Sequence, residues 1–332
     1  AVIIFTTVGG FRGVAVTDAL CGIAMLVGIV VLAAGILIAG GGWENIMGTI
    51  RTNHPQMLEP LSGGTMPVSL YFTQWLLVGI FTFALPQSVV RCMGYKDTKS
   101  LRGAMIGGTI IIGAMMIGVT TLGVLSAGVL TGDLASYGGS VDNIIPRTIV
   151  ETLPPWLAGV AIVGPVAASI STVSSLLIAS SSAIIKDLWL HYADDRGQQV
   201  SDAVVARSSQ IITLGVGVIV FVLAVVPPSV IWKINMFAFG GLETAFCWVL
   251  VGALFFKRAN KVGAIASMVG GTAVYCLCMA LGFKLFGLHQ IVIGITVSLL
   301  CMVIGSWLGN RRANAADAAA DAEMREVFFP EA

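Results

Sequence analysis

Residues 156–186 read WLAGVAIVGPVAASISTVSSLLIASSSAIIK, an unbroken apolar segment long enough to cross a lipid bilayer. Eight hydroxyl side chains lie within it: Ser169, Ser171, Thr172, Ser174, Ser175, Ser180, Ser181 and Ser182. Hydrocarbon cannot hydrogen-bond these groups, so each one left unpaired there would cost several kcal/mol. The segment therefore predicts a membrane helix whose hydroxyl face meets neighbouring helices, water or an ion.

Three residues of this segment share one helical face. Ala168, Ser171 and Thr172 stand at positions i, i+3 and i+4. Two hydroxyls and freed backbone carbonyls at this spacing suit a small hard cation such as Na⁺. The alternative is that the small residues let helices pack closely, with the hydroxyls bonded back to carbonyls one turn earlier. The residue pattern leaves both interpretations open.

The composition indicates an all-α integral membrane protein. The chain has 332 residues, 57% hydrophobic and 11% charged, whereas about 25% of residues are charged in a typical soluble domain. A net charge of +1 implies no nucleic-acid partner. The six cysteines fall almost entirely in apolar runs without zinc spacing, which argues against a disulfide framework. The chain starts inside an apolar run, and we expect it to be the C-terminal part of a longer protein.

Apolar runs of about 20 residues predict eight membrane spans. They cover 14–40, 68–92, 101–130, 156–186, 204–226, 231–256, 262–285 and 289–309, and residues 1–8 would be the tail of a ninth. Residues 1–310 are thus expected to form a transmembrane domain. Residues 311–332, rich in Ala, Asp and Glu, are expected to form a solvated, partly disordered tail.

The distribution of Lys and Arg predicts the orientation of these spans. With Arg12 in the cytoplasm, the alternating spans place fourteen of the 18 basic residues on the cytoplasmic side, together with the C-terminal tail. The outer side keeps Arg51, Arg147, Lys233 and Lys284. In one outer loop, Ile144–Leu153 predicts a short amphipathic helix that ends before Pro154.

The sequence contains no catalytic motif. The three histidines are far apart, and no nucleophile elbow, P-loop or metal-binding motif is present. We therefore expect that the protein is not an enzyme. ATP-driven transport would need a separate subunit, so a solute-coupled carrier is the simpler interpretation.

Two spans carry signals for a break near the membrane midplane, where carriers often bind solute and ions. The second reads GIFTFALPQ over residues 79–87, and Pro86 is expected to free the carbonyl of Thr82 and kink the helix. The sixth has Gly240-Gly241 followed by Glu243, and an ionisable residue inside a membrane is a functional candidate. The alternatives are a packing kink at Pro86 and a neutral Glu243 carboxyl bonded to a neighbouring helix.

Residues 253–273, ALFFKRANKVGAIASMVGGTA, resemble the C-terminal signature of the solute:sodium symporter family at every defined position. TTVGGF at residues 6–11 is similar to the end of the other family signature, although Gly13 replaces its usual small residue and its earlier half is absent. Within the family, the chain most resembles the members that carry pantothenate. That likeness is carried by residues 9–12, 83–86, 90–92, 95–97, 185–188 and 238–243.

The resemblance implies the LeuT-type inverted-repeat fold with its N-terminal part missing. The first full span would end repeat one, spans two to six would form repeat two, and the last two would be peripheral. It implies a Na⁺ site made by the Ala168 carbonyl and the Ser171 and Thr172 hydroxyls. It further implies that Thr82, Phe83 and Gln87 contact the solute. Glu243 is added as a solute-binding candidate because of its place in the membrane.

The expected function is Na⁺-coupled import of a small carboxylate, with pantothenate as the first candidate, by alternating access in the cell (inner) membrane. Na⁺ is the expected coupling ion, and the solute and the lipid bilayer are the expected partners, with no obligate protein partner implied. A symporter of the same family for proline, a monocarboxylate or another small solute is the alternative. A transporter-like membrane sensor is a more distant one.

Overall fold

The computed structural model describes residues 2–92, 94–130, 132, 138–198, 200–225 and 229–312. These ranges contain helices and no β-strand. The expected tail lies outside them from residue 313 onward. The chain forms two compact units, which are described separately: unit 1 comprises residues 1–59 and 95–230, and unit 2 comprises residues 60–94 and 231–332.

Unit 1 contains the long apolar helices α1, α6, α8 and α10, joined by shorter elements. Its elements are α1 (Val2–Ala39), α2 (Trp43–Asn53), η1 (Pro55–Met57), α6 (Thr98–Ser126), η4 (Val141–Asn143), α7 (Ile144–Thr152), α8 (Pro155–Ser182), the π-helix η5 (Ala183–Leu190), α9 (His191–Asp195) and α10 (Asp202–Ala224).

Helix α1 is two helices that meet at Gly10, whose φ of 56° and ψ of −163° are not helical. Only glycine adopts this conformation at little cost. This break separates the predicted tail of a preceding span from the first full span, which runs from Gly13 to Ala39.

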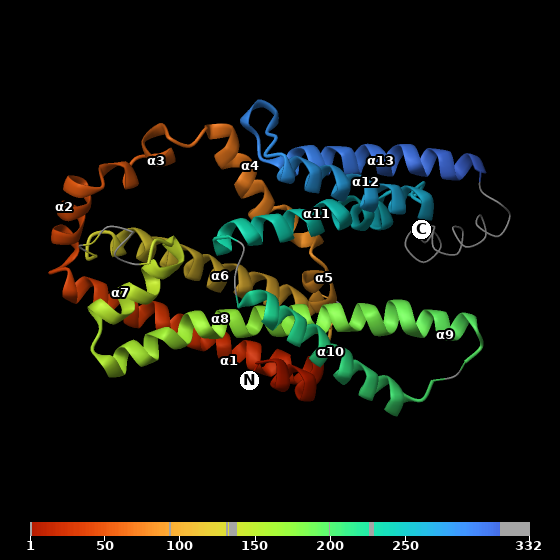
Figure 1. Cartoon of the computed structure of the whole chain (residues 1–332), viewed down its shortest axis with the longest axis horizontal. Coiled ribbons are helices and arrows are strands. Elements are labelled where there is room, and N and C mark those ends of the chain that lie inside the picture. The colour runs from red at the N-terminus through yellow and green to blue at the C-terminus, as the bar shows by residue number, and fades with distance from the viewer. Residues whose placement is uncertain are drawn as a thin grey trace. The chain divides into compact units, whose positions relative to one another are not determined.

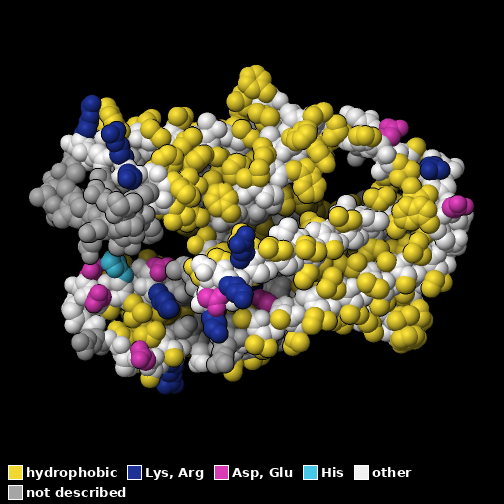
Figure 2. Space-filling model, turned by 180° about the vertical axis from the view of Figure 1, so that it is seen from behind, with side chains coloured by type: hydrophobic (Ala, Val, Ile, Leu, Met, Phe, Trp, Pro, Cys, Tyr) yellow, Lys and Arg dark blue, Asp and Glu magenta, His cyan; other side chains and the backbone are white. Residues whose placement is uncertain are grey.

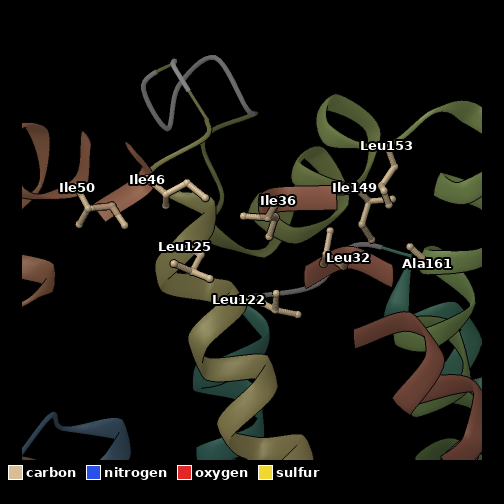
Figure 3. Packing of buried hydrophobic residues seen from close by; sticks show 9 residues of the cluster. All are labelled: Leu32, Ile36, Ile46, Ile50, Leu122, Leu125, Ile149, Leu153 and Ala161. Carbon is tan, nitrogen blue, oxygen red and sulfur yellow. The ribbon is translucent and has the colours of Figure 1, made fainter. Parts of the chain in front are cut away.

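The core of unit 1 lies where α1, α2, α6 and α7 converge (Figure 3). Ile36 of α1, Ile46 of α2 and Ile149 of α7 are all at most 1% exposed. The predicted amphipathic helix at Ile144–Leu153 is confirmed as α7. Helix α2 is a finding that the sequence analysis missed, because the mixed polar loop conceals its buried pair Ile46 and Ile50 at i and i+4.

Unit 2 contains a broken span and three continuous apolar helices. Its elements are α3 (Leu61–Gly64), α4 (Val68–Gly79), η2 (Phe81–Ala84), α5 (Pro86–Cys92), α11 (Ile231–Phe255), α12 (Lys261–Ala280), η6 (Leu285–Gly287) and α13 (Gln290–Arg312). Helices α12 and α13 run side by side (Figure 1).

Small residues allow the close packing of α12 and α13. A Cβ added at Gly271 would lie 2.5 Å from Ser298 Cβ, and one added at Gly305 would lie 2.9 Å from the Gly263 Cα. Ser267 and Ser298 share a hydrogen bond of 2.8 Å across the interface. Close helix contact and interhelical hydroxyl bonds are the usual means of association in lipid.

The eight predicted spans correspond to seven long apolar helices and one bent pair, α4–η2 with α5. Large apolar side chains cover much of the surface (Figure 2). On α6, for example, Ile106, Ile110 and Ile117 are 59%, 68% and 71% exposed. A soluble protein rarely exposes apolar surface on this scale, whereas a lipid bilayer solvates it. The chain is a multi-pass membrane protein.

One boundary and one break differ from the sequence-based expectation. The fourth span does not end at Lys186, because the helix continues through η5 and α9 to Asp195 (Figure 1). At about 1.5 Å per residue, its 41 residues are about twice as long as a bilayer core of about 30 Å requires. The predicted break at Gly240-Gly241 is wrong, because α11 is continuous from Ile231 to Phe255.

Candidate functional site

Three oxygens converge on one face of α8, at the positions selected from the sequence. Ser171 Oγ lies 3.1 Å from the Ala168 carbonyl oxygen, and Thr172 Oγ1 lies 3.0 Å from the same oxygen. Both hydroxyls therefore donate to one carbonyl. Each hydroxyl oxygen keeps lone pairs that could face a cation. Na⁺ binding would require the two O–H groups to turn away from the carbonyl, while their oxygens could stay in place.

Several other hydroxyls of α8 are also bonded within the helix. Ser169 Oγ donates to Pro165 O at 3.1 Å, Ser174 Oγ donates to Ile170 O at 2.7 Å, and Ser175 Oγ donates to Ser171 O at 2.6 Å. Such back-bonding is what packing without an ion would also produce. The shared acceptor at Ala168 brings three oxygens together, and the Ser171 carbonyl does the same with the Ser174 and Ser175 hydroxyls at 3.1 Å and 2.6 Å. The resemblance noted in the sequence, and not the hydrogen-bond geometry, selects the set at Ala168.

A tight crossing with α1 fixes the position of α8 one turn before these oxygens. A Cβ at Gly28 of α1 would lie 3.0 Å from the Gly164 Cα and 3.1 Å from the Ala161 carbonyl oxygen. Pro165 lacks an N–H and cannot donate to the Ala161 carbonyl, which lies at this crossing. Beyond the crossing, Ser171 is half-buried and Thr172 is exposed within the described chain.

The second candidate region is the break between η2 and α5 in unit 2. The two parts of the span meet at 45° around Leu85, whose φ of −67° and ψ of 128° are extended. The kink predicted at Pro86 is confirmed. The expected free carbonyl at Thr82 is wrong, because the Leu85 N–H donates to it at 3.2 Å in a 3₁₀ turn.

The break gives its side chains two different surroundings. Ala84 and Leu77 are at most 1% exposed and pack into a cluster with Met236 of α11. Phe83, in contrast, is 44% exposed. Thr82 and Gln87 are half-buried on either side of the break. The three predicted solute contacts Thr82, Phe83 and Gln87 thus all lie at the break in unit 2, and their contact with a solute stays a prediction.

Glu243, the fourth predicted solute contact, has a different environment. It is 0% exposed, at the centre of α11, and its Oε1 and Oε2 have no hydrogen-bond partner among the described residues. The helices of unit 2 enclose it within a hydrophobic cluster that includes Cys247 and Tyr275. The sequence identified this residue, but the importance of Tyr275 and Gly240 for its surroundings was missed.

The described residues contain no group of three or more His, Cys, Asp and Glu side chains that could hold a metal ion. The oxygen set on α8 is instead made of hydroxyls and a carbonyl, which are uncharged hard ligands. Such ligands fit a hard monovalent cation better than a transition metal.

Long apolar helices, a span broken in its middle and oxygens within another span define a membrane protein of the carrier type. The chain belongs to the sodium:solute symporter family, whose family model matches residues 1–271.

Individual relatives support the same assignment. The chain is 36% identical over 310 residues to the sodium/pantothenate symporter of Haemophilus influenzae. It is 35% identical over 310 residues to the sodium/pantothenate symporter of Escherichia coli. It is 27% identical over 316 residues to the osmoregulated proline transporter OpuE of Bacillus subtilis. These alignments cover 93–95% of this chain and 63% of each relative, so the chain spans less than two thirds of their length.

Proposed function

We propose that the protein is a Na⁺-coupled symporter that imports a small carboxylate, pantothenate, by alternating access. The observation that carries this proposal is the convergence of the Ala168 carbonyl and the Ser171 and Thr172 hydroxyls inside an apolar span. Family membership and the two relatives described as sodium/pantothenate symporters support both the ion and the solute.

In this mechanism the Ala168 carbonyl and the two hydroxyls replace part of the hydration shell of Na⁺. Thr82, Phe83 and Gln87 contact the solute at the break of the second span. We assign α1 to the end of repeat one, the span formed by α4, η2 and α5 through to α11 to repeat two, and α12 and α13 to the periphery. Glu243 would contact solute only if the packing around α11 opened, because it is fully enclosed in unit 2.

The ion gradient is sufficient to drive such transport. One Na⁺ that moves inward across about 100 mV releases about 2.3 kcal/mol. A tenfold Na⁺ gradient adds about 1.4 kcal/mol, and together they sustain roughly a 500-fold gradient of a neutral solute. For an anionic solute, the negative charge of the solute cancels the membrane-potential contribution of one Na⁺, so two Na⁺ per anion would be more effective.

The test is uptake by the intact protein in proteoliposomes. We expect labelled pantothenate to accumulate under an inward Na⁺ gradient and not under a matched K⁺ gradient. Proline is the second candidate solute, because OpuE is a proline transporter. Na⁺-driven uptake of proline without pantothenate would replace the solute and keep the mechanism. Absence of Na⁺-driven uptake of either solute, of monocarboxylates and of other small solutes would refute symport and favour the sensor.

We also propose a cytoplasmic C-terminus, in the cell (inner) membrane, from the Lys and Arg distribution. A cysteine introduced at Lys261 should react with an impermeant reagent only from the cytoplasm, and one at Gly139 only from outside. Labelling at Lys261 in intact cells would reverse the orientation.

A further inference from the structure

Glu243 lies at the thirteenth of the 25 residues of α11 and is completely buried, yet neither carboxyl oxygen has a hydrogen-bond partner among the described residues. Among the described residues, no ion pair joins it to a basic side chain. An ionised carboxylate in such a place is strongly disfavoured, because burial removes its hydration and nothing replaces it.

Three hydroxyls of this part of unit 2 are directed at other acceptors. The Tyr275 hydroxyl of α12 donates to the Met236 carbonyl at 2.8 Å. The Thr244 hydroxyl donates to Gly240 O at 2.9 Å, and the Ser298 hydroxyl of α13 donates to Thr244 O at 2.8 Å. The protons of these three hydroxyls are therefore not donated to the carboxyl.

Gly240 explains how this arrangement is built. It lies three residues before Glu243, on the same face of α11. A Cβ there would collide with the Tyr275 hydroxyl and ring. The missing side chain lets Tyr275, which is 0% exposed, close over the helix and exclude water from this face. Gly240 thus serves helix packing around Glu243 and not a break in α11.

The titratable groups packed around Glu243 do not supply a positive charge. They are the Cys247 thiol one turn later on α11 and the Tyr275 phenol and Cys276 thiol of α12. The residues contributed to this cluster by α4, η2 and α13 are apolar: Leu77, Val78, Phe81, Ala84, Ile291, Val292 and Ile295. His289 at the start of α13 uses its Nδ1 to accept from the Ile291 N–H at 3.2 Å.

We propose that Glu243 is a proton-binding site, occupied in the packed conformation of unit 2 and emptied when that packing opens to water. A proton fits better than Na⁺, because a proton needs only the carboxyl oxygen, whereas a metal ion needs several oxygen ligands together. The transport consequence, which rests on the proposed function, is that Glu243 carries a negative charge only in the opened conformation, in which it would repel an anionic solute. A rise in pH would then disfavour the packed state.

Infrared spectroscopy of the intact protein without solute tests proton occupancy directly. We expect a protonated carboxyl C=O band near neutral pH that is absent in Glu243→Gln and that shifts when glutamate is labelled with ¹³C. The isotope shift needs no variant, so the test holds even if Glu243→Gln misfolds. Absence of a glutamate band from the wild type at neutral pH would overturn the proposal.

The link to packing is tested at Cys247, which is 2% exposed and one turn from Glu243. Its alkylation by a permeant maleimide can be followed by mass spectrometry, with Glu243→Gln as the control for the intrinsic effect of pH on the thiol. From about pH 7 to about pH 9 the ratio of ionised to protonated carboxyl changes about 100-fold, so we expect at least about tenfold faster labelling in the wild type than in the control. Equal rates at the higher pH would refute the linkage.

Both measurements are made without solute or a Na⁺ gradient, so they do not depend on transport. Failure of the uptake panel with a positive infrared result would remove the symport mechanism and leave the proton site. Successful uptake without a glutamate band would keep the symport mechanism and remove the proton site.

Discussion

Removing one hydroxyl from the oxygen set on α8 separates the ion-binding interpretation from simple packing. Ser171 Oγ and Thr172 Oγ1 lie 3.1 Å and 3.0 Å from the Ala168 carbonyl oxygen. In Ser171→Ala or Thr172→Ala, a bound Na⁺ would lose one hard oxygen ligand without a replacement. This should weaken Na⁺ binding by about 1–3 kcal/mol, the cost of an unmet polar partner. The affinity change is about 5- to 150-fold.

The assay is the Na⁺ concentration for half-maximal solute uptake by the intact protein, measured at equal surface expression. Both alanine variants should raise it, and Thr172→Ser, which keeps the hydroxyl, should be mild. Ser169→Ala is the matched control, because this neighbouring hydroxyl bonds only the Pro165 carbonyl at 3.1 Å. We expect it to keep the wild-type Na⁺ dependence.

Packing alone predicts the opposite result, because alanine is well tolerated at a helix interface of small residues. Normal expression with unchanged Na⁺ dependence in both Ser171→Ala and Thr172→Ala would refute the ion site. The two hydroxyls would then only donate hydrogen bonds to a backbone carbonyl of α8.

Three further changes test the surrounding structure. Gly28→Ala places a Cβ 3.0 Å from the α8 backbone, and it should lower the free energy of unfolding by about 1–3 kcal/mol. The control Gly22→Ala, which has nothing within 4 Å, should be neutral or stabilising by up to about 1 kcal/mol. Destabilisation of similar size in both variants would exclude the tight crossing. Thr82→Val or Gln87→Ala should raise the KM for pantothenate more than that for Na⁺, and unchanged kinetics in well-expressed variants would place the solute elsewhere. Asp97 accepts from a backbone N–H in the first turn of α6, which lowers its pKa. Its support of that turn is present above the ordinary carboxyl pKa and is lost as pH falls through the lowered value. The protection of these amides from hydrogen exchange, relative to the intrinsic rate at each pH, should therefore fall in acid in the wild type and already be low at neutral pH in Asp97→Ala.

The sequence predicted those features that depend on local chemistry. Eight spans follow from apolar length, and α7 follows from its amphipathic pattern and the proline pair after it. The convergence of Ser171 and Thr172 on the Ala168 carbonyl follows from helical spacing. The continuation of α8 to Asp195 could not be predicted in this way, because polar residues after Lys186 resemble a loop when their helical neighbours are unknown.

Pro86 and Gly240 show why one predicted break exists and the other does not. Proline acts on its own backbone: it lacks an N–H and disfavours a helical conformation in Leu85, so the span bends there whatever surrounds it. Glycine has no such local effect and only permits a conformation or a close approach. At Gly10 it permits a non-helical turn, and at Gly240 it permits the approach of Tyr275 from a helix 35 residues later in the chain. The same residue type therefore interrupts one helix and allows close packing around Glu243 in another. The residues that pack against the glycine decide which of the two occurs.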